Sequence, residues 1–263
     1  MPAKQKKLPK SAGPLQAAPD SSGKPSPKDT KRAGSFVVGL SCISVLLSII
    51  IAFKVLTPLL LTLPIFPFFL SALRRQRRRE AVDLTMRWAA TIFICSVLAG
   101  GFVPGRAERS FLFASRSADA FEEWIGSVEG APPADFGYLL GGGLIFLAAA
   151  LPSGGALGFI IGSIALASSG YGAAYAFRHG DNIFHIVLIA LPPWQWSLFI
   201  GCLFLLVPVV LVVNRFYPSG ESKRAEDVRF YAYVGAGFYV LSFILRLATA
   251  GLWKTITERW TVF

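Results

Sequence analysis

The chain of 263 residues is 54% hydrophobic and only 16% charged, with a mean hydropathy of +0.56, and this composition excludes an ordinary soluble protein. Its net charge of +11 would suggest a nucleic-acid partner in a soluble protein. The basic residues instead gather in two blocks that flank apolar runs, as topology signals do, so we expect no nucleic acid. The composition predicts an all-α, polytopic transmembrane bundle of about seven hydrophobic segments, with the lipid bilayer as its first partner.

The N-terminal region, residues 1–35, is rich in Pro, Lys, Ser and Ala and has almost no bulky apolar side chain. Such a segment cannot bury enough surface to offset the entropy lost on ordering. We predict a disordered cytoplasmic tail. The first apolar run begins near residue 36, too far from a short basic start for a cleaved secretory signal.

Two apolar runs occupy residues 36–73 and are separated by Lys54. The second run contains Pro58, Pro64 and Pro67, each of which removes a backbone donor and disturbs the preceding helical turn. This pattern predicts a tight N-terminal membrane hairpin. It leaves open whether the second arm crosses the bilayer or only dips into it.

A basic linker is predicted over residues 74–87, and both ends of the hairpin should be cytoplasmic because cytoplasmic loops are enriched in Lys and Arg. The linker begins with an arginine cluster that comprises Arg74, Arg75, Arg77, Arg78 and Arg79. We interpret this arginine cluster as a topology signal. Binding of anionic lipid headgroups is the alternative, and the two interpretations are compatible.

A five-segment transmembrane domain is predicted over residues 88–263. Its first segment leads outward into a loop over residues 105–135, where acidic residues outnumber basic ones. Within that loop, residues 121–128 have apolar side chains at spacings of three, four and seven. This spacing indicates an amphipathic turn that lies on the membrane surface.

A second hairpin is predicted from the apolar runs 136–151 and 155–177, which are joined by a very short Pro-Ser-Gly-Gly turn. Gly158 and Gly162 have the GxxxG spacing that lets helix backbones approach closely. We interpret these glycines as packing positions within the chain. Homodimerisation through the same helix face is the alternative.

An unusually long apolar run extends from Ile183 to Val213. As one straight helix its roughly 31 residues would measure about 46 Å, against a hydrocarbon core of about 30 Å. Pro192 and Pro193 should therefore break this run and leave backbone carbonyl groups without donors. The donors that follow directly are those of Trp194, Gln195, Trp196 and Ser197. The break is either a kink at the headgroup boundary or the end of a half-helix that precedes a spanning helix.

Arg246 lies within the last apolar run. A central arginine costs about 2.5–3.5 kcal/mol on insertion scales, so it needs a partner. The other apolar runs contain no carboxylate. We therefore expect the carbonyl groups of residues 188–191, freed by the prolines, to accept hydrogen bonds from Arg246.

We find no nucleophile with a nearby base, no carboxylate pair and no metal-binding motif, so we predict no enzymatic activity, cofactor or metal. His179 and His185 are not accompanied by other residues at ligand spacing. The three cysteines, Cys42, Cys95 and Cys202, lie in separate apolar runs. We interpret them as small buried hydrophobic residues that form neither a disulfide framework nor a metal site.

The order of elements over about residues 88–255 resembles that of the stage II sporulation protein M family of integral membrane proteins. Residues 191–198, "LPPWQWSL", fall where that family has an interrupted motif of the type Leu-Pro-His-Gly-x-Phe-Glu-Leu. Residues 217–237 resemble the charged segment that leads into its last helix. The matching motif positions are Leu191, Pro192 and Leu198. The departures are Pro193 for His, Trp194 for Gly, Ser197 for Glu, and Arg246 near the place of a Glu in the final helix.

This resemblance implies a scaffold that assembles with peptidoglycan-degrading partners. We accordingly expect a non-enzymatic scaffold or subunit of a membrane complex in the cell membrane, associated with other membrane or envelope proteins and possible as a homo-oligomer. The N-terminus should be cytoplasmic and the C-terminus outside. The alternative is a permease-like transporter with an anion site near the broken helix and Arg246.

Overall fold

The computed structural model describes residues 27–116, 118–119, 134–179, 193–213 and 222–260. Over these residues the chain is helical and contains no β-strand. Six of its helical segments are long and apolar enough to cross a membrane, and Gly141–Ala150 forms a shorter apolar segment. The expected all-α transmembrane bundle is therefore confirmed, with a number of segments close to the expected seven.

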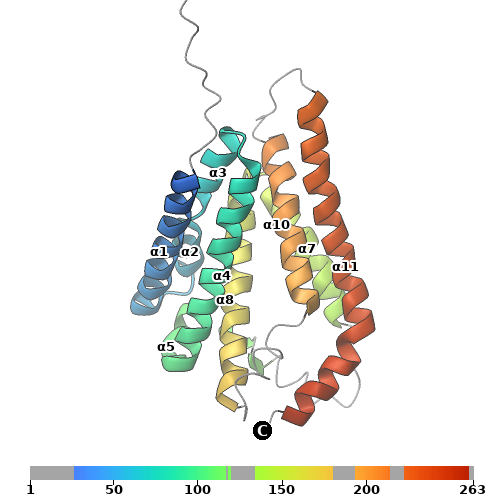
Figure 1. The fold of residues 1–263 in the computed structure, drawn as a ribbon. Coiled ribbons are helices and arrows are strands. Elements are labelled where there is room, and N and C mark those ends of the chain that lie inside the picture. The colour runs from blue at the N-terminus through green and yellow to red at the C-terminus, as the bar shows by residue number, and fades with distance from the viewer. Residues whose placement is uncertain (1–26, 117, 120–133, 180–192, 214–221, 261–263) are drawn as a thin grey trace, which may run out of the picture.

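The first hairpin consists of α1 (Pro27–Ile51), α2 (Thr57–Thr62) and α3 (Phe66–Arg74). Helix α1 runs away from the N-terminus, and α2 and α3 together form the returning arm (Figure 1). This arm, Thr57–Arg74, is 18 residues long and apolar enough to span. Its prolines interrupt the helix, but the arm is still long enough to span the hydrocarbon core.

The helices on both sides of this hairpin extend beyond the apolar runs. Helix α1 includes residues 27–35, which hydropathy assigns to the N-terminal tail. Residues 1–26 lie outside the described residues. On the other side, α4 (Arg78–Phe102) begins four residues after α3 ends, so most of the predicted linker 74–87 is already helix. Both differences arise because helices extend past their apolar stretches into polar residues that hydropathy alone assigns to connections.

Beyond α4 the chain forms the short helix α5 (Pro104–Ser110). The predicted amphipathic turn at 121–128 lies outside the described residues. The second hairpin is observed as α7 (Ala134–Ala150) and α8 (Ala156–His179). Its turn contains Gly154 and Gly155 at φ of 59° and 97°, a left-handed conformation that glycine adopts without steric cost.

The chain ends with α10 (Pro193–Val213) and α11 (Ser222–Trp260). Helix α11 includes residues 222–227, which hydropathy assigns to a cytoplasmic connection. Helix α1 begins and α11 ends at opposite ends of the bundle (Figure 1).

The helices form two groups, one of α1 to α5 with α8 and the other of α7, α10 and α11. Contacts between α7 and α8 join the two groups. Helices α2 and α4 pack against α8, and α1, α3 and α5 pack against α4, whereas α7 packs with α10, and α10 packs along α11 (Figure 1). Helix α7 also contacts α8, and α10 contacts α4. The largest fully buried side chains include Trp88, Phe69, Phe159, Leu61 and Ile65. The N-terminal hairpin therefore shares one core with the helices of the predicted five-segment domain.

Candidate functional site

The returning arm of the first hairpin contains a helix break at membrane depth. Helix α2 ends at Thr62 and α3 begins at Phe66. Pro64 has no N–H to donate to the helix, and the N–H of Ile65 donates to the carbonyl of Thr62 at 3.2 Å rather than to Leu61. The carbonyl of Leu61 consequently lacks the donor that a continuous helix would supply.

Trp88 on α4 provides the missing donor. Its indole Nε1–H donates to the Leu61 carbonyl oxygen at 2.8 Å, and both residues are fully buried. Broken backbone is tolerated in a membrane where neighbouring side chains satisfy the released groups. Trp88 therefore stabilises the break and fixes α4 against the returning arm. Sequence reasoning missed this pair, because Trp88 is a single indole in an apolar run.

An aromatic cluster surrounds the same position. Phe159 on α8 makes edge-to-face contacts with Trp88 at 5.5 Å, with Phe69 at 4.9 Å and with Phe66 at 6.0 Å between ring centroids. Edge-to-face geometry places a positive ring edge on a negative ring face and is the favoured arrangement. The cluster joins α3, α4 and α8 into one rigid unit.

The Pro58 carbonyl in α2 forms a second polar link to α8. It accepts the hydroxyl of Thr62 at 2.8 Å and the hydroxyl of Ser163 at 3.3 Å. The Ser163 hydroxyl also lies 2.8 Å from the Ile160 carbonyl. Small hydroxyl side chains commonly connect helices inside a membrane in this way. The broken arm is thus held from α4 and from α8.

The predicted site around Pro192 and Pro193 is described only from Pro193 onward. The described part of this run is α10, Pro193–Val213. Pro192 and the carbonyl groups of residues 188–191 lie outside the described residues. With 21 residues, α10 measures about 31 Å and can cross the membrane unaided.

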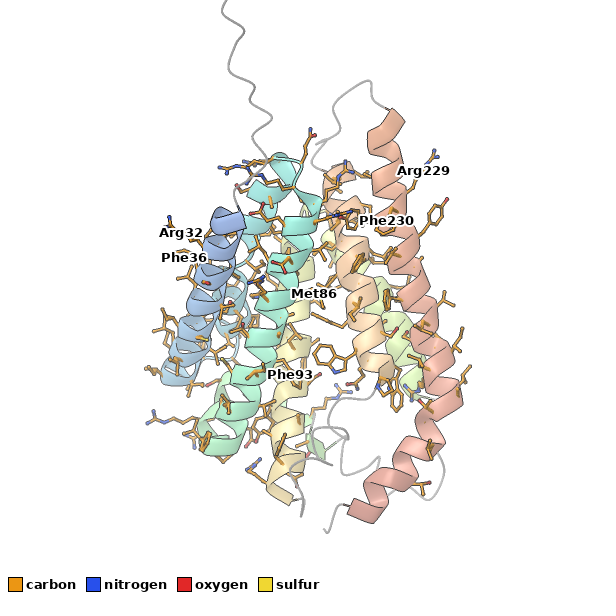
Figure 2. The ribbon with its side chains drawn as sticks, viewed as in Figure 1. Arg32, Phe36, Met86, Phe93, Arg229 and Phe230 are labelled. Carbon is orange, nitrogen blue, oxygen red and sulfur yellow. The ribbon has the colours of Figure 1, made fainter. Side chains whose placement is uncertain are left out.

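The side chains that follow Pro193 point to different neighbours. Trp194 is buried near Ala250 of α11, whereas Gln195 is exposed. The ring of Trp196 lies 5.5 Å from that of Phe93, on the side of α4 that faces α10 (Figure 2). Consecutive helical residues are rotated by about 100°, so four in a row cannot face one centre.

Ser197 contributes to a close approach of α10 and α11. Its hydroxyl donates to the Phe238 carbonyl of α11 at 2.8 Å. One turn further, a Cβ on Gly201 would lie 3.0 Å from the Gly235 carbonyl oxygen, and a Cβ on Gly235 would lie 2.9 Å from the Leu205 backbone nitrogen. Only glycine permits the two backbones to pack this closely.

Gly158 and Gly162 are buried within the chain. A Cβ on Gly158 would meet Ala150 of α7 and Leu206 of α10, each at 3.1 Å. A Cβ on Gly162 would meet Phe146 and Trp88 at 3.7 and 3.9 Å. The helix face that contains both glycines is therefore covered by the chain's own helices, which supports their interpretation as packing positions.

Arg246 is buried in α11, with 6% of its surface exposed. It lies one turn before Ala250, the residue that packs with Trp194. Its expected partners, the carbonyl groups of residues 188–191, are outside the described residues. Arg246 and the start of α10 thus belong to the same end of the α10–α11 pair, and their predicted hydrogen bonds stay a prediction.

The structure brings together two cysteines that the sequence places 53 residues apart. The sulfur atoms of Cys42 on α1 and Cys95 on α4 are 3.7 Å apart, and both thiols are free. Cys202 is buried in α10. The sequence contains no signal for this proximity, because no CxxC or similar spacing connects the two positions.

The arginine cluster forms the junction of α3 and α4. Arg74 is the last residue of α3 and Arg78 the first of α4, and Gln76 turns the chain at φ of 59°. Arg77 pairs with Glu80 at 3.6 Å between Nη1 and Oε2. Arg32 and Arg229 lie toward the same end of the bundle (Figure 2), so this end is strongly basic.

Comparison of the chain with protein-family models, with curated proteins and with solved structures finds no match. The function is therefore inferred from the arrangement of the helices. The sites above stabilise helix contacts with hydroxyl, indole and glycine positions.

Proposed function

We propose that this chain is a non-enzymatic scaffold or subunit of a membrane complex. The observation that supports the proposal best is the open side of α11. Only 17% of its spanning window Val228–Leu252 is buried within the chain, compared with 44% for Arg78–Phe102 and 56% for Ala156–Tyr175. A terminal helix that packs along one edge leaves the remainder of its surface for a second membrane protein.

The exposed surface of α11 is large and apolar. It includes Phe230, Tyr233, Ile244, Leu247 and Leu252. Small residues lie among them, since a Cβ on Gly237 or Gly251 would meet nothing within 4 Å. Bulky and small side chains together provide the ridges and gaps with which transmembrane helices pack.

The length of α11 supports the same function. The helix has 39 residues and its spanning window has 25, so 39 less 25 leaves 14 residues beyond the window. At about 1.5 Å per residue the whole helix measures about 58 Å, compared with a hydrocarbon core of about 30 Å. A helix that continues past the bilayer offers a partner both a membrane surface and an aqueous surface.

We further propose that the protein lies in the cell membrane with a cytoplasmic N-terminus, because the arginine-rich end of the bundle is the end at which α1 begins. The other end of the bundle, where α11 finishes, is then outside. The resemblance in layout to the stage II sporulation protein M family supports the same class of function, with envelope proteins as partners.

The proposal is tested by native mass spectrometry of the protein extracted from its own membranes in mild detergent. We expect a stoichiometric complex that contains a second polypeptide. Tyr233→Ala with Leu247→Ala should reduce the amount of that polypeptide about tenfold, whereas the matched pair Phe36→Ala with Ile50→Ala on the exposed face of α1 should retain it. A 28.5 kDa monomer, an assembly of this chain alone, or equal loss in both pairs would contradict the proposal.

A second candidate, a permease-like anion transporter, is favoured by one observation. Arg246 is buried at 6% exposure within an apolar span, and intramembrane charges often mark substrate paths. In proteoliposomes this function predicts uptake of chloride or phosphate that Arg246→Lys retains and Arg246→Gln abolishes. Absence of uptake in the parent protein would reject it.

A further inference from the structure

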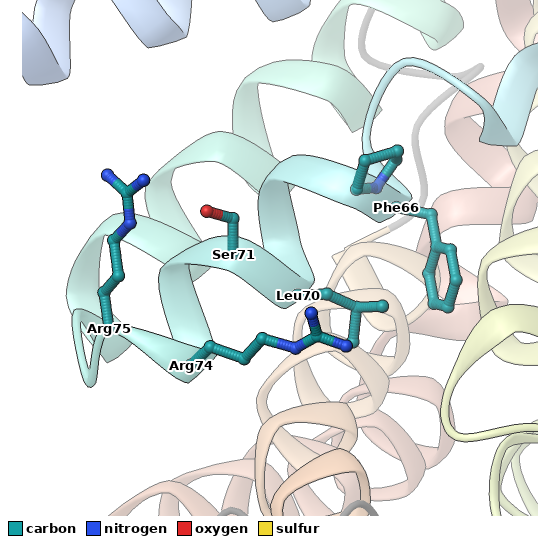
Figure 3. A pocket seen from close by; sticks show the side chains of 6 residues that line it. Phe66, Leu70, Ser71, Arg74 and Arg75 are labelled. Carbon is teal, nitrogen blue, oxygen red and sulfur yellow. The ribbon is translucent and has the colours of Figure 1, made fainter.

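A shallow depression of about 440 Å³ lies along one face of α3. It is lined by Phe66, Pro67, Leu70, Ser71, Arg74 and Arg75 (Figure 3). These positions are spaced at four-residue intervals in two adjacent rows, which form one continuous stripe on a helix. The stripe changes in polarity along its length, from aromatic and aliphatic residues to a hydroxyl and then to two guanidinium groups.

The polar end of this α3 groove is at the basic end of the bundle. Figure 3 shows the Ser71 hydroxyl on the side of α3 to which Arg75 points, and the Arg74 side chain passing beside Leu70. Both arginines are exposed. The tight turn that follows, closed by the Arg77 N–H on the Ala72 carbonyl at 2.8 Å, makes α4 start at once and concentrates basic charge around the groove.

The apolar end of the groove continues into the membrane-spanning part of α3. Phe66 and Leu70 are half-buried, whereas Pro67 is exposed. From Phe66 to Arg74 the helix rises about 12 Å, which is comparable with the distance from a lipid phosphate to the upper part of its acyl chains. A topology signal requires only positive charge near the span. It does not require an apolar groove directly beneath that charge.

We propose that the α3 groove binds an anionic phospholipid. The phosphate group accepts hydrogen bonds from the guanidinium groups of Arg74 and Arg75 and from the Ser71 hydroxyl. An acyl chain lies along Phe66, Pro67 and Leu70. Guanidinium groups are suited to this role because they bind phosphate oxygens in a bidentate way, and basic residues at this depth attract anionic lipids electrostatically. The inference depends on membrane insertion and not on the proposed scaffold function.

The test uses native mass spectrometry of the full-length protein in mild detergent. It measures the binding of phosphatidylglycerol and, for comparison, of phosphatidylcholine. Arg74→Gln with Arg75→Gln should lower affinity for phosphatidylglycerol at least tenfold and leave phosphatidylcholine binding unchanged. The matched control is Arg106→Gln with Arg109→Gln, which removes two exposed arginines from α5 at the other end of the bundle. That pair should change the affinity less than twofold.

Two further arms identify the ligand. Inorganic phosphate at millimolar concentration should not displace phosphatidylglycerol if the acyl chain contributes, and Leu70→Asn should weaken lipid binding several-fold with both arginines present. The single variant Arg75→Gln changes only an exposed side chain. It replaces the double variant in the affinity measurement if the double variant does not fold. Equal losses in the α3 and α5 pairs, or full competition by inorganic phosphate, would overturn the proposal.

Discussion

At the scale of single residues, the most informative contact is that of Trp88 with the break between α2 and α3. The indole donates to a carbonyl group that no backbone N–H satisfies, at 2.8 Å. An unpaired buried acceptor costs about 1–3 kcal/mol, whereas the hydrogen bond itself contributes less on balance. The residue is therefore more important for the donor it supplies than for its ring alone.

We expect Trp88→Phe to lower the free energy of unfolding by about 1–3 kcal/mol, because the ring contact with Phe159 stays and the donor is lost. The measurement is chemical or thermal unfolding in detergent. Trp196→Phe is the control, since the Trp196 ring packs on Phe93 without a described hydrogen bond, and it should cost less. Equal losses in the two variants would contradict this role of the indole.

Combining Trp88→Phe with Pro64→Ala tests the cause of the unpaired carbonyl. The alanine restores a backbone N–H at position 64, so α2 and α3 can join and Ile65 can donate to Leu61. Trp88→Phe should then cost less in the Pro64→Ala background than alone, which a double-mutant cycle measures as non-additivity. Additive effects would show that the break does not arise from Pro64.

At the scale of helices, α10 and α11 are held together by backbone proximity. Gly201 and Gly235 face each other where a Cβ would lie about 3 Å from backbone atoms of the other helix, and backbone cannot move aside as a flexible side chain can. The Ser197 hydroxyl adds a hydrogen bond to the Phe238 carbonyl. Packing of this kind replaces the hydrophobic drive that is absent between helices in lipid.

We expect Gly235→Ala to destabilise the protein by about 1–3 kcal/mol, because the added methyl group forces α10 and α11 apart. Gly237→Ala is the matched control on the same helix, where a Cβ meets nothing within 4 Å. Alanine favours helix over glycine by up to about 1 kcal/mol, so the control should be neutral or slightly stabilising. Unfolding midpoints in detergent check both. Equal shifts would contradict a close backbone contact at Gly235.

Hydropathy and proline positions were enough to predict the spanning segments, both hairpins and the basic end. They did not show which broken segment would be central to packing. The predicted break at prolines 192 and 193 adjoins residues outside the described part of the chain, and α10 (Pro193–Val213) is by itself long enough to span. The break at Pro64 depends on Trp88, which is distant in sequence, and the Gly201–Gly235 pair depends on the relative rotation of two helices. A single sequence shows neither which distant residues are in contact nor how two helices are rotated relative to each other.

At the scale of the whole molecule, α1 packs along α4 and joins the N-terminal hairpin to the other helices. The Cys42 and Cys95 sulfur atoms, 3.7 Å apart, report on this packing. Mild oxidation of the purified protein should form an intramolecular disulfide between them, detected as a loss of two hydrogens in the joined peptides. Cys42→Ser should abolish it and Cys202→Ser should not. A disulfide that involves Cys202 would contradict the arrangement of α1 and α4.

The topology of the whole molecule depends on the returning arm crossing the membrane despite its prolines. Lys54 and Arg79 are both exposed, and they precede and follow that arm, Thr57–Arg74, whose two ends lie at opposite ends of the bundle (Figure 1). In a background with Cys42, Cys95 and Cys202 replaced by Ser, an impermeant thiol reagent applied to intact cells should label Lys54→Cys and Ser115→Cys. It should label Arg79→Cys only after permeabilisation. Labelling of positions 54 and 79 from the same side would contradict a spanning arm.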